Sequence, residues 1–441
     1  MALLTKAPRG TQDVLPADSA KWQYVESTLL ETAKLFGFQE IRVPTFEHTE
    51  LFNRSVGDTT DVVQKEMYTF EDKGNRSITL RPEGTAGVVR SVLEHSLLNE
   101  GLPVKACYIL SCFRYEKPQA GRLREFHQFG AEVFGPADAT ADAQLISMVH
   151  EILETLGVWD VSLRINSIGC PKCRGAYNQM LKEYFQTHYD QLCPTCQERL
   201  DKNPMRILDC KSPVCQEIAK GAPKILDHIC PECQEHFQKL QEYLTLAGIE
   251  FTVDPWIVRG LDYYTKTVFE FVSNNIGAQG TVCGGGRYDG LVKELGGADT
   301  PALGFGMGLE RLLLVMEQSG SEFPPKSTCD LYIANRGGEA AKLAFQLTNR
   351  LVKEGYVAEC DLMNRSLKAQ MKYADKLGAK FSMVLGEDEL ASGTAKLKNM
   401  RTGESFDLLL GDSFVEDFYS RMIETVYEDL EDASEHLKPE R

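Results

Sequence analysis

The first clear pattern along the chain is a run of apolar residues at helical spacing from about Asp18 to Leu35, which Asp18 or Ser19 can cap. The pattern then changes to strands and turns. Residues 105–113 and 125–134 alternate between apolar and polar positions, and a loop rich in positive charge joins them. This arrangement predicts a long antiparallel hairpin.

The return strand of this hairpin has two different faces, because successive side chains of a strand point to opposite sides. One face is mostly apolar and carries His127, Phe129, Ala131 and Val133. The other face carries Phe126, Gln128, Gly130 and Glu132. We interpret the second face as a binding surface. Antiparallel strands with helices on one side describe an α+β core.

The strand pattern is interrupted between residues 170 and 250, where cysteine pairs and a helical, charged pattern predict an inserted domain. Strand character resumes at Phe251. After Pro324 and Pro325 strands and helices alternate, which predicts a separate α/β domain with a largely parallel sheet. The elements expected there are residues 331–334, 339–354, 357–361, 367–377 and 381–385.

A polar segment leads directly into a strand-like run at residues 265–272. The segment reads Arg259-Gly260-Leu261-Asp262-Tyr263-Tyr264. With strand periodicity, one face carries Tyr264, Lys266, Val268 and Glu270, and the other carries Tyr263, Thr265, Thr267, Phe269 and Phe271. A purely structural strand rarely has a cation just before its start together with such polar groups. The segment is therefore a candidate binding site.

Composition and charge narrow the class of protein. A chain of 441 residues, 43% hydrophobic, is globular and long enough for two or three domains. The formal net charge of −16 argues against nonspecific affinity for nucleic acid, and we expect no DNA partner. A local basic site is still compatible with that charge. The hairpin loop supplies one, with Arg114, Lys117, Arg122 and Arg124.

The N-terminus lacks an apolar stretch of the length of a secretory signal, and no segment reaches membrane-spanning length. We therefore expect a cytoplasmic protein with no membrane partner. Because that compartment keeps thiols reduced, the clustered members of the 13 cysteines indicate metal rather than disulfides. The remaining cysteines are expected to be buried free thiols: Cys107, Cys112, Cys283, Cys329 and Cys360.

Three of the clustered cysteine pairs have CxxC spacing, and two tetrahedral zinc sites of structural role would use the whole set. The set comprises Cys170, Cys173, Cys193, Cys196, Cys210, Cys215, Cys230 and Cys233. The favoured grouping joins 170/173 with 230/233 and 193/196 with 210/215, although other groupings satisfy the same count. A redox role is weaker, because no thioredoxin-like strand and helix surround the pairs.

Several motifs occur together in a characteristic order. The segment at 259–264 resembles the histidine-specific signature of histidyl-tRNA synthetases, and its partner signature is Cys283-Gly284-Gly285-Gly286-Arg287-Tyr288-Asp289-Gly290-Leu291. Residues 113–116, Phe-Arg-Tyr-Glu, resemble motif 2 of class II synthetases, and residues 304–311, Gly-Phe-Gly-Met-Gly-Leu-Glu-Arg, resemble motif 3. The proline-containing segment 38–47 resembles motif 1. The resemblance extends from Arg9 to about residue 426.

This resemblance implies an α+β fold with a class II antiparallel-sheet catalytic core in residues 1–169 and 251–325. It places the helical, cysteine-rich insertion at 170–250 and an α/β anticodon-binding domain at 326–426. Residues 427–441 are expected to be an acidic tail. The implied partners are L-histidine, ATP and tRNA(His), and motif 1 implies a homodimer.

The implied reaction is ATP-dependent ligation of L-histidine to the 3′ end of tRNA(His) through a histidyl-adenylate. It needs no protein nucleophile, because the histidine carboxylate itself attacks the α-phosphate, so the protein must position the reactants and stabilise charge. By resemblance, Arg114 would hold the α-phosphate and Arg311 the γ-phosphate. Arg259 would lie beside the reacting carboxylate and the α-phosphate. Mg²⁺ belongs with the triphosphate.

Further roles follow from the same resemblance. Glu116 and Phe126 would hold and stack the adenine, and the glycines of motif 3 would let a flat group such as adenosine approach the strand. Recognition of an imidazole requires an acceptor and a hydroxyl in a water-poor pocket. The expected histidine ligands are Glu83, Thr85, Gln128, Glu132, Arg259, Tyr263 and Tyr264. The expected contacts with the tRNA acceptor end are Gln119 and Arg122.

Two other functions compete with this interpretation. One is a catalytically inactive paralogue that senses histidine as the regulatory subunit of ATP phosphoribosyltransferase. Such paralogues generally lack the anticodon domain and have degraded catalytic motifs, whereas Arg114, Arg259 and Arg311 are present here. The other is a zinc-stabilised tRNA-binding module without catalysis, which would have no reason to retain a histidine pocket.

Overall fold

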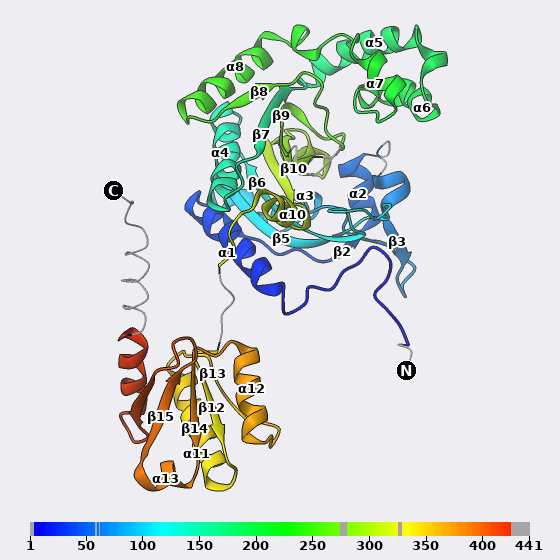
Figure 1. Ribbon diagram of the computed structural model, residues 1–441. Coiled ribbons are helices and arrows are strands. Elements are labelled where there is room, and N and C mark those ends of the chain that lie inside the picture. The colour runs from blue at the N-terminus through cyan, green and yellow to red at the C-terminus, as the bar shows by residue number, and fades with distance from the viewer. Residues whose placement is uncertain (1–3, 58–59, 61, 274–279, 325–328, 425–441) are drawn as a thin grey trace. The chain divides into compact units, whose positions relative to one another are not determined.

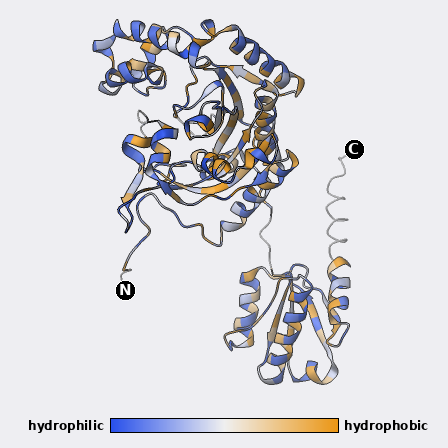
Figure 2. Ribbon diagram, turned by 180° about the vertical axis from the view of Figure 1, so that it is seen from behind, coloured by the Kyte–Doolittle hydropathy of each residue, from blue (hydrophilic) through white to orange (hydrophobic). Residues whose placement is uncertain are grey.

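The computed structural model describes residues 4–57, 60, 62–273, 280–324 and 329–424. The chain divides into two compact units, Met1–Pro324 and Pro325–Arg441 (Figure 1). The first unit contains an eight-stranded and a three-stranded sheet, the second contains a five-stranded sheet, and each unit has its own hydrophobic core. Figure 2 shows hydrophobic residues along the strands of both units.

An eight-stranded sheet forms the centre of the first unit, in the order β1-β5-β6-β11-β10-β9-β7-β8. Neighbouring strands are antiparallel, except that β1 with β5 and β7 with β8 are parallel. The strands are β1 (Gln39–Glu40), β5 (Val104–Phe113), β6 (Glu125–Phe134), β7 (Val161–Ser167), β8 (Phe251–Val253), β9 (Thr265–Ser273), β10 (Thr281–Arg287) and β11 (Ala302–Gly308). The predicted α+β class is confirmed.

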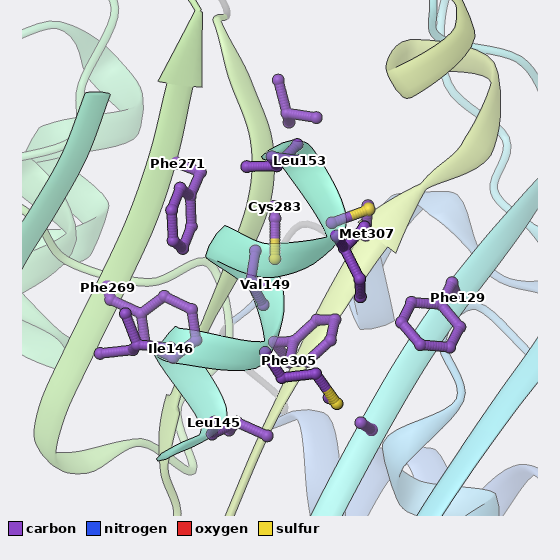
Figure 3. Packing of buried hydrophobic residues seen from close by; sticks show 14 of the residues in the cluster. Phe129, Leu145, Ile146, Val149, Leu153, Phe269, Phe271, Cys283, Phe305 and Met307 are labelled. Carbon is purple, nitrogen blue, oxygen red and sulfur yellow. The ribbon is translucent and has the colours of Figure 1, made fainter. Parts of the chain in front are cut away.

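Helices cover one face of this sheet. They are α1 (Ser19–Leu35), α4 (Ala139–Thr155) and α10 (Leu309–Ser319). Figure 3 shows Phe269, Phe271 and Phe305 of the sheet packed beside Ile146 and Val149 of α4. Because this face is occupied by the core, the polar residues of β6 lie on the other face, where a ligand can be held.

The predicted helix and hairpin are confirmed. The helix α1 begins at Ser19, after Asp18, and ends at Leu35. The strands β5 and β6 pair in antiparallel fashion along their whole length, from Val104 opposite Phe134 to Phe113 opposite Glu125. The apolar face of β6 also packs as expected, since Phe129, Ala131 and Val133 belong to the core under the helices.

The uniform alternation predicted for residues 263–271 is wrong at one point. The pairing of β9 with β10 shifts register next to Val268, and Lys266 has a φ of 48°. Val268 pairs with Gly286 and Thr265 with the adjacent Arg287, so Lys266 and Thr267 of β9 form a bulge that has no opposite residue on β10. Tyr263 and Tyr264 lie before the start of β9, outside the regular strand, and their ring centroids lie 4.7 Å apart.

The segment that resembles motif 1 is divided between two sheets. It enters the large sheet as β1 and leaves as β2 (Phe46–His48), which joins β4 (Ser77–Leu80) and β3 (Tyr68–Glu71) in the order β2-β4-β3. Between them, Arg81 donates to the carbonyls of Val43 and Pro44 at 2.7 and 2.9 Å. The helices α2 (Thr49–Val56), α3 (Thr85–Glu94) and α9 (Leu291–Glu294) contact one another beside this sheet. Short turns η1 (Val62–Glu66) and η2 (Leu97–Asn99) complete the region.

The predicted helical insertion lies between β7 and β8. Its helices are α5 (Pro171–Gln186), α6 (Pro194–Lys202), α7 (Pro213–Ala219) and α8 (Pro231–Leu246), with short turns η3 (Tyr189–Gln191), η4 (Pro204–Ile207) and η5 (Ile225–Asp227). Cys170, Cys193 and Cys230 each occupy an N-cap, directly before a proline at the first helical position. Proline suits that position because its backbone has no N–H to leave unpaired there.

The second unit contains a five-stranded sheet in the order β13-β12-β14-β15-β16. The strands β13 and β14 run parallel to β12, as predicted, but β15 and β16 are antiparallel additions that the sequence analysis missed. The elements are β12 (Leu331–Asn335), α11 (Gly338–Lys353), β13 (Ala358–Cys360), α12 (Leu367–Leu377), β14 (Phe381–Leu385), α13 (Glu387–Ser392), β15 (Thr394–Asn399) and β16 (Ser405–Leu409). Residues 414–424 are helical.

Other expectations have mixed outcomes. Cys107, Cys112, Cys283 and Cys329 are buried free thiols as predicted, but Cys360 is partly exposed at the end of its strand, so that prediction is wrong. The expected acidic tail lies outside the described residues. Within the described ranges, none of the helices is both long enough and apolar enough to cross a membrane.

Candidate active site

A cleft of about 400 Å³ lies over the polar face of the large sheet. Its wall includes residues from β6, β9, β10 and β11, the hairpin loop, and a loop of the insertion. The lining residues include Arg114, Glu116, Arg122, Phe126, Gln128, Asp209, Lys211, Arg259, Glu270, Gly284, Gly306, Gly308 and Arg311. The structure thus brings together all three arginines that the sequence analysis selected as catalytic.

One side of the cleft gathers positive charge. The Arg114 Nε donates to the Pro82 carbonyl at 2.8 Å, and the Arg311 Nη1 donates to the Thr281 carbonyl at 2.6 Å. Arg122 forms an ion pair with Glu116, with 2.9 Å between Nη1 and Oε2. Burial and the repulsion of Arg122 lower the pKa of Arg311. Cations held close together in this way suit a ligand with several negative charges, such as a polyphosphate.

An aromatic side chain lies among these arginines. The guanidinium of Arg114 lies 5.4 Å from the ring centroid of Phe126, within the range of a cation–π contact. Glu116 borders the same cleft and approaches Arg114 to 4.0 Å. A planar base that enters here meets a ring to stack on and a carboxylate that accepts hydrogen bonds.

A buried carboxylate lies on the same face of β6. Glu132 is 0% exposed and accepts hydrogen bonds from the hydroxyls of Thr85, Tyr108 and Tyr288 at 2.8, 2.9 and 2.5 Å. Burial raises the pKa of Glu132 to about 8, against the lowering effect of the hydroxyl donors. Glu83, also fully buried, contributes by repulsion. Such a group prefers a neutral or cationic hydrogen-bond donor as its partner.

Glycines make room for these side chains. A Cβ built at Gly304 would lie 1.6 Å from the Glu132 Oε2, and a Cβ at Gly306 would lie 2.3 Å from the Gln128 Nε2. The expectation that the motif 3 glycines leave their strand bare is therefore wrong for Gly304 and Gly306, because side chains of β6 already cover them. At Gly308 the nearest atom is 3.9 Å away, so only there is the strand open.

The segment before β9 delivers a cation to the cleft. Arg259 forms an ion pair with Glu270, and its guanidinium lies 5.8 Å from the ring centroid of Tyr264. Burial lowers the pKa of Arg259, but the Glu270 carboxylate and Tyr264 raise it, and the net shift is upward. The Arg259 Nε is buried and has no hydrogen-bond partner among the described residues. Gly284 allows this approach, since a Cβ there would meet the guanidinium at 2.4 Å.

The side chains expected to bind the α-amino and carboxylate groups of histidine lie close together near the start of α3. Both oxygens of Glu83 accept backbone N–H groups, from Thr85 at 2.7 Å and Ala86 at 2.8 Å. The Gln128 Oε1 accepts the Gly84 N–H at 3.1 Å. Tyr263 is buried, and its ring centroid lies 5.5 Å from that of Tyr288. Glu83 thus caps the helix in this structure.

The two residues expected at the tRNA acceptor end form a turn at the tip of the hairpin. Gln119 and Arg122 make an isolated β-bridge, with N–O distances of 3.0 and 2.9 Å. Arg122 lines the main cleft, whereas Gln119 lines a second cavity of about 520 Å³ beside α1 and α10. The tip of the hairpin therefore borders both the main cleft and the second cavity.

Sequence reasoning missed several residues of this site. Tyr108 and Tyr288 hold Glu132, and Tyr288 could have been found because it belongs to the second signature. Glu270 shares a strand face with Val268 and pairs with Arg259. Asp209 and Lys211 come from the insertion and line the cleft. The sequence gives one signal for these two residues, which is their position on either side of Cys210. No periodic pattern indicates that the insertion reaches the cleft over the sheet.

The clustered cysteines form two separate groups of four thiols. The groups are Cys170, Cys173, Cys230 and Cys233, and Cys193, Cys196, Cys210 and Cys215, with the sulfur atoms of each group within 4.8 Å of one another. This is the grouping that the sequence favoured. Burial raises the pKa of Cys170, but hydrogen bonds, including those from the N–H groups of Cys173 and Lys172, together have the larger, opposite effect. The net result lowers the pKa to about 7. Both groups could hold a metal ion.

Comparisons with known proteins show the family to which the chain belongs. The family model described as histidyl-tRNA synthetase matches residues 10–173 and 195–312, and an anticodon binding domain matches residues 330–415. A histidine–tRNA ligase of Caldanaerobacter subterraneus subsp. tengcongensis is 56% identical over 408 residues, 92% of this chain and 98% of that protein.

Solved structures give the same result. Apo histidyl-tRNA synthetase of S. aureus has a TM-score of 0.81 and 42% identity, and the match covers 94% of this chain and 100% of that one. A protein described as an ATP phosphoribosyltransferase regulatory subunit/histidyl-tRNA synthetase, from Bacillus halodurans C, has a TM-score of 0.60 and 21% identity, covering 88% and 100%. The latter shares the fold alone. On the family match and the first relative, this chain belongs to the histidyl-tRNA synthetase family.

Proposed function

We propose that this chain activates L-histidine with ATP to form histidyl-adenylate and then transfers the histidyl group to the 3′ end of tRNA(His). The observation that carries the proposal is the pairing of two environments on one sheet face. The buried Glu132, held by three hydroxyls, provides a place for an imidazole, and the cleft with Arg114, Arg259 and Arg311 provides a place for phosphates.

Recognition of histidine rests on hydrogen bonds that other side chains cannot make. The carboxylate of Glu132 accepts an imidazole N–H, and the hydroxyl of Tyr264 meets the other ring nitrogen, with Tyr263 packed beside it. Glu83, Thr85 and Gln128 bind the α-amino and carboxylate ends. A site built on buried hydrogen bonds rejects analogues that lack them by roughly 10⁴-fold or more, so no separate editing site is required.

Adenylate formation then needs charge stabilisation. A carboxylate oxygen of histidine attacks the α-phosphorus of ATP, the bond to the bridging oxygen breaks, and pyrophosphate leaves. Arg114 and Arg259 stabilise the charge on the α-phosphate, and Arg311 holds the γ-phosphate, while Phe126 and Glu116 hold the adenine. Mg²⁺ bound with the triphosphate offsets its charge.

In the second step, a ribose hydroxyl of the terminal adenosine attacks the carbonyl carbon of the adenylate, and AMP leaves. The hairpin tip, with Gln119 and Arg122, steers the acceptor end toward the cleft that Arg122 lines.

The matched anticodon-binding domain engages another part of the tRNA. We propose that this domain spans residues 326–426, that the catalytic core spans 1–169 and 251–325, and that the insertion spans 170–250.

The two thiol groups each hold one structural zinc ion in this proposal. Four sulfurs within 4.8 Å of one another match the ligand number and type of a tetrahedral Zn(Cys)₄ site. We also propose a homodimer that works in the cytoplasm, where its tRNA substrate is used. The motif 1 segment and the sheet β2-β4-β3, which exposes Phe46 and Phe70, support an interface there.

Pyrophosphate exchange into ATP tests the proposal. The purified chain is assayed with magnesium, without tRNA, and with each of the twenty amino acids in turn. Exchange with histidine alone is the expected result. No exchange, with histidine still bound, would favour the regulatory paralogue, which the identity with histidine–tRNA ligases does not favour.

A further inference from the structure

The segment from Arg259 to Lys266 carries the cation and the tyrosines of the proposed histidine pocket, yet little regular structure holds it. Between residues 254 and 264 the chain has neither helix nor strand. Lys266 then adopts a left-handed φ of 48°, a backbone conformation that is unfavourable for a residue with a side chain. The conformation of this segment must therefore be set by contacts with its surroundings.

The first cysteine group supplies several of these contacts. Gly169, next to Cys170, accepts the backbone N–H of Lys266 at 2.9 Å. Arg174, next to Cys173, donates from Nη1 to the carbonyl of Tyr264 at 2.9 Å and to that of Asp262 at 3.5 Å.

A third contact from the same group is weaker. Glu232, between Cys230 and Cys233, lies 3.2 Å from the Lys266 ammonium. Its side chain is 78% exposed, so this ion pair contributes little. The Gly169 and Arg174 contacts, made to backbone groups, carry the connection.

The second cysteine group contacts the other end of the segment. The buried Arg206 donates from Nη1 to the carbonyl of Arg259 at 3.1 Å, and the Asn203 Nδ2 donates to the Asp262 Oδ1 at 2.9 Å. Both donors lie in the short stretch that leads to Cys210. Asp209 and Lys211, on either side of that cysteine, line the active-site cleft itself.

These contacts share one feature. Each comes from a residue adjacent to a cluster cysteine or from the stretch between Cys196 and Cys210. Four thiols within 4.8 Å of one another stay together in ionised form only if a cation offsets their charge. A metal ion bound in each group would hold the cysteines, and with them the neighbouring donors, in fixed positions. Figure 1 shows the insertion helices at the end of the sheet where β8 and β9 lie.

We infer that metal bound in the two cysteine groups sets the conformation of the Arg259–Lys266 segment and thereby the affinity of the enzyme for histidine. Arg174 and Asn203 are positioning residues that transmit this effect. The inference rests on the proposed function, since it assumes both the metal sites and the location of the histidine pocket. It differs from a purely structural role, in which metal would stabilise the insertion alone and leave histidine affinity unchanged.

Variants that spare every thiol separate these two roles. In Arg174→Ala and Asn203→Ala, the full-length protein keeps both cysteine groups but loses the link from one group to the segment. The control is Lys220→Ala, which removes an exposed cation of the insertion that forms an ion pair with Glu217. Histidine affinity is measured by titration calorimetry, zinc per chain by elemental analysis, and the KM values for histidine and ATP by pyrophosphate exchange.

The expected result is two zinc ions per chain in the wild type and in all three variants. Histidine should bind about tenfold more weakly to Arg174→Ala and several-fold more weakly to Asn203→Ala, as loss of a charged and a neutral hydrogen bond predicts. The KM for ATP should stay within twofold, and Lys220→Ala should match the wild type. Arg174→Lys should recover part of the affinity.

A double-mutant cycle adds a second criterion. Cys173→Ser should lose one zinc ion and weaken histidine binding at least as much as Arg174→Ala, and the combined variant should be no worse than Cys173→Ser alone. Unchanged histidine affinity in both Arg174→Ala and Asn203→Ala would overturn the inference, as would a zinc-free wild type with full activity. If Arg174→Ala does not fold, Asn203→Ala decides. Absence of histidine-dependent exchange in the wild type counts against the proposed function instead, because the calorimetric affinities do not depend on catalysis.

Discussion

The hydroxyl of Tyr288 donates to the carboxylate of Glu132, although the two residues are 156 positions apart. Tyr288 belongs to the second histidine signature, and Glu132 lies on the return strand of the hairpin. Their contact joins the second signature to the hairpin in one buried network, to which Thr85 and Tyr108 also donate. The predictions below follow from this network and from the cleft beside it.

Replacing Glu132 by glutamine should abolish most of the selectivity for histidine. The amide has nearly the same shape, but an NH2 donor replaces one of the two acceptor oxygens and the negative charge that attracts an imidazole N–H is lost. We expect kcat/KM for histidine in pyrophosphate exchange to fall by about 10²- to 10³-fold, with the KM for ATP nearly unchanged. Tyr288→Phe, which removes one donor and keeps the carboxylate, should lose only about tenfold. Equal kcat/KM values for Glu132→Gln and wild type would contradict the role of this residue.

Stability without ligand should depend on pH through Glu132. Burial raises the pKa of its carboxyl from 4.5 to about 8, so the folded chain holds a proton that the unfolded chain releases between those values. The free energy of unfolding should therefore fall as pH rises from about 5 to 8, by roughly 2–5 kcal/mol. Denaturant titrations across this range measure the slope. The Glu132→Gln variant should show a flatter dependence, and equal slopes in the two proteins would refute the assignment.

Arg259→Ala should act mainly on the chemical step. The guanidinium is proposed to stabilise charge at the α-phosphate, so kcat for exchange should fall by about 10²- to 10³-fold while histidine still binds. Glu270→Gln is the matched comparison, because it removes the charge that pairs with Arg259 and keeps the cation. Its kcat should fall less than tenfold. Unchanged exchange by Arg259→Ala would show that another group performs this role.

Gly304→Ala should damage the pocket without touching a functional side chain. The added Cβ would lie 1.6 Å from the Glu132 Oε2, so the carboxylate or the strand must move. We expect a loss of about 1–3 kcal/mol in unfolding free energy and weaker histidine binding. Gly175→Ala is the control, since nothing lies within 4 Å of its Cβ and it occupies the helix α5. That variant should be neutral or more stable by up to about 1 kcal/mol.

The sequence predicted the fold well where a regular period governs the chain. The hairpin of β5 and β6 and the first strands and helices of the second unit were found because alternating apolar positions identify their buried faces. The bulge at Lys266 and the strands β15 and β16 were not found. A bulge depends on the register with a partner strand, which a single segment does not encode, and short edge strands carry few buried positions.

The residues of the candidate site likewise fall into those that the sequence could predict and those that it could not. Arg114 and Arg259 could be selected because the motifs place them, and Glu132 because it lies on the polar face of the return strand. The cysteine grouping followed from spacing. Asp209 and Lys211 could not be selected, because their place in the cleft depends on how the insertion folds back over the sheet. The glycines of motif 3 predict space for a ligand, whereas the structure uses Gly304 and Gly306 to accommodate Glu132 and Gln128.

The most direct test of the central claim is aminoacylation of a tRNA(His) transcript with radiolabelled histidine, ATP and Mg²⁺, followed by nuclease digestion that releases the terminal adenosine. The account predicts histidine esterified to that adenosine, at a rate that Glu132→Gln and Arg259→Ala each reduce at least 10²-fold. Absence of histidyl-adenosine from a chain that is folded and binds both histidine and the transcript would contradict it.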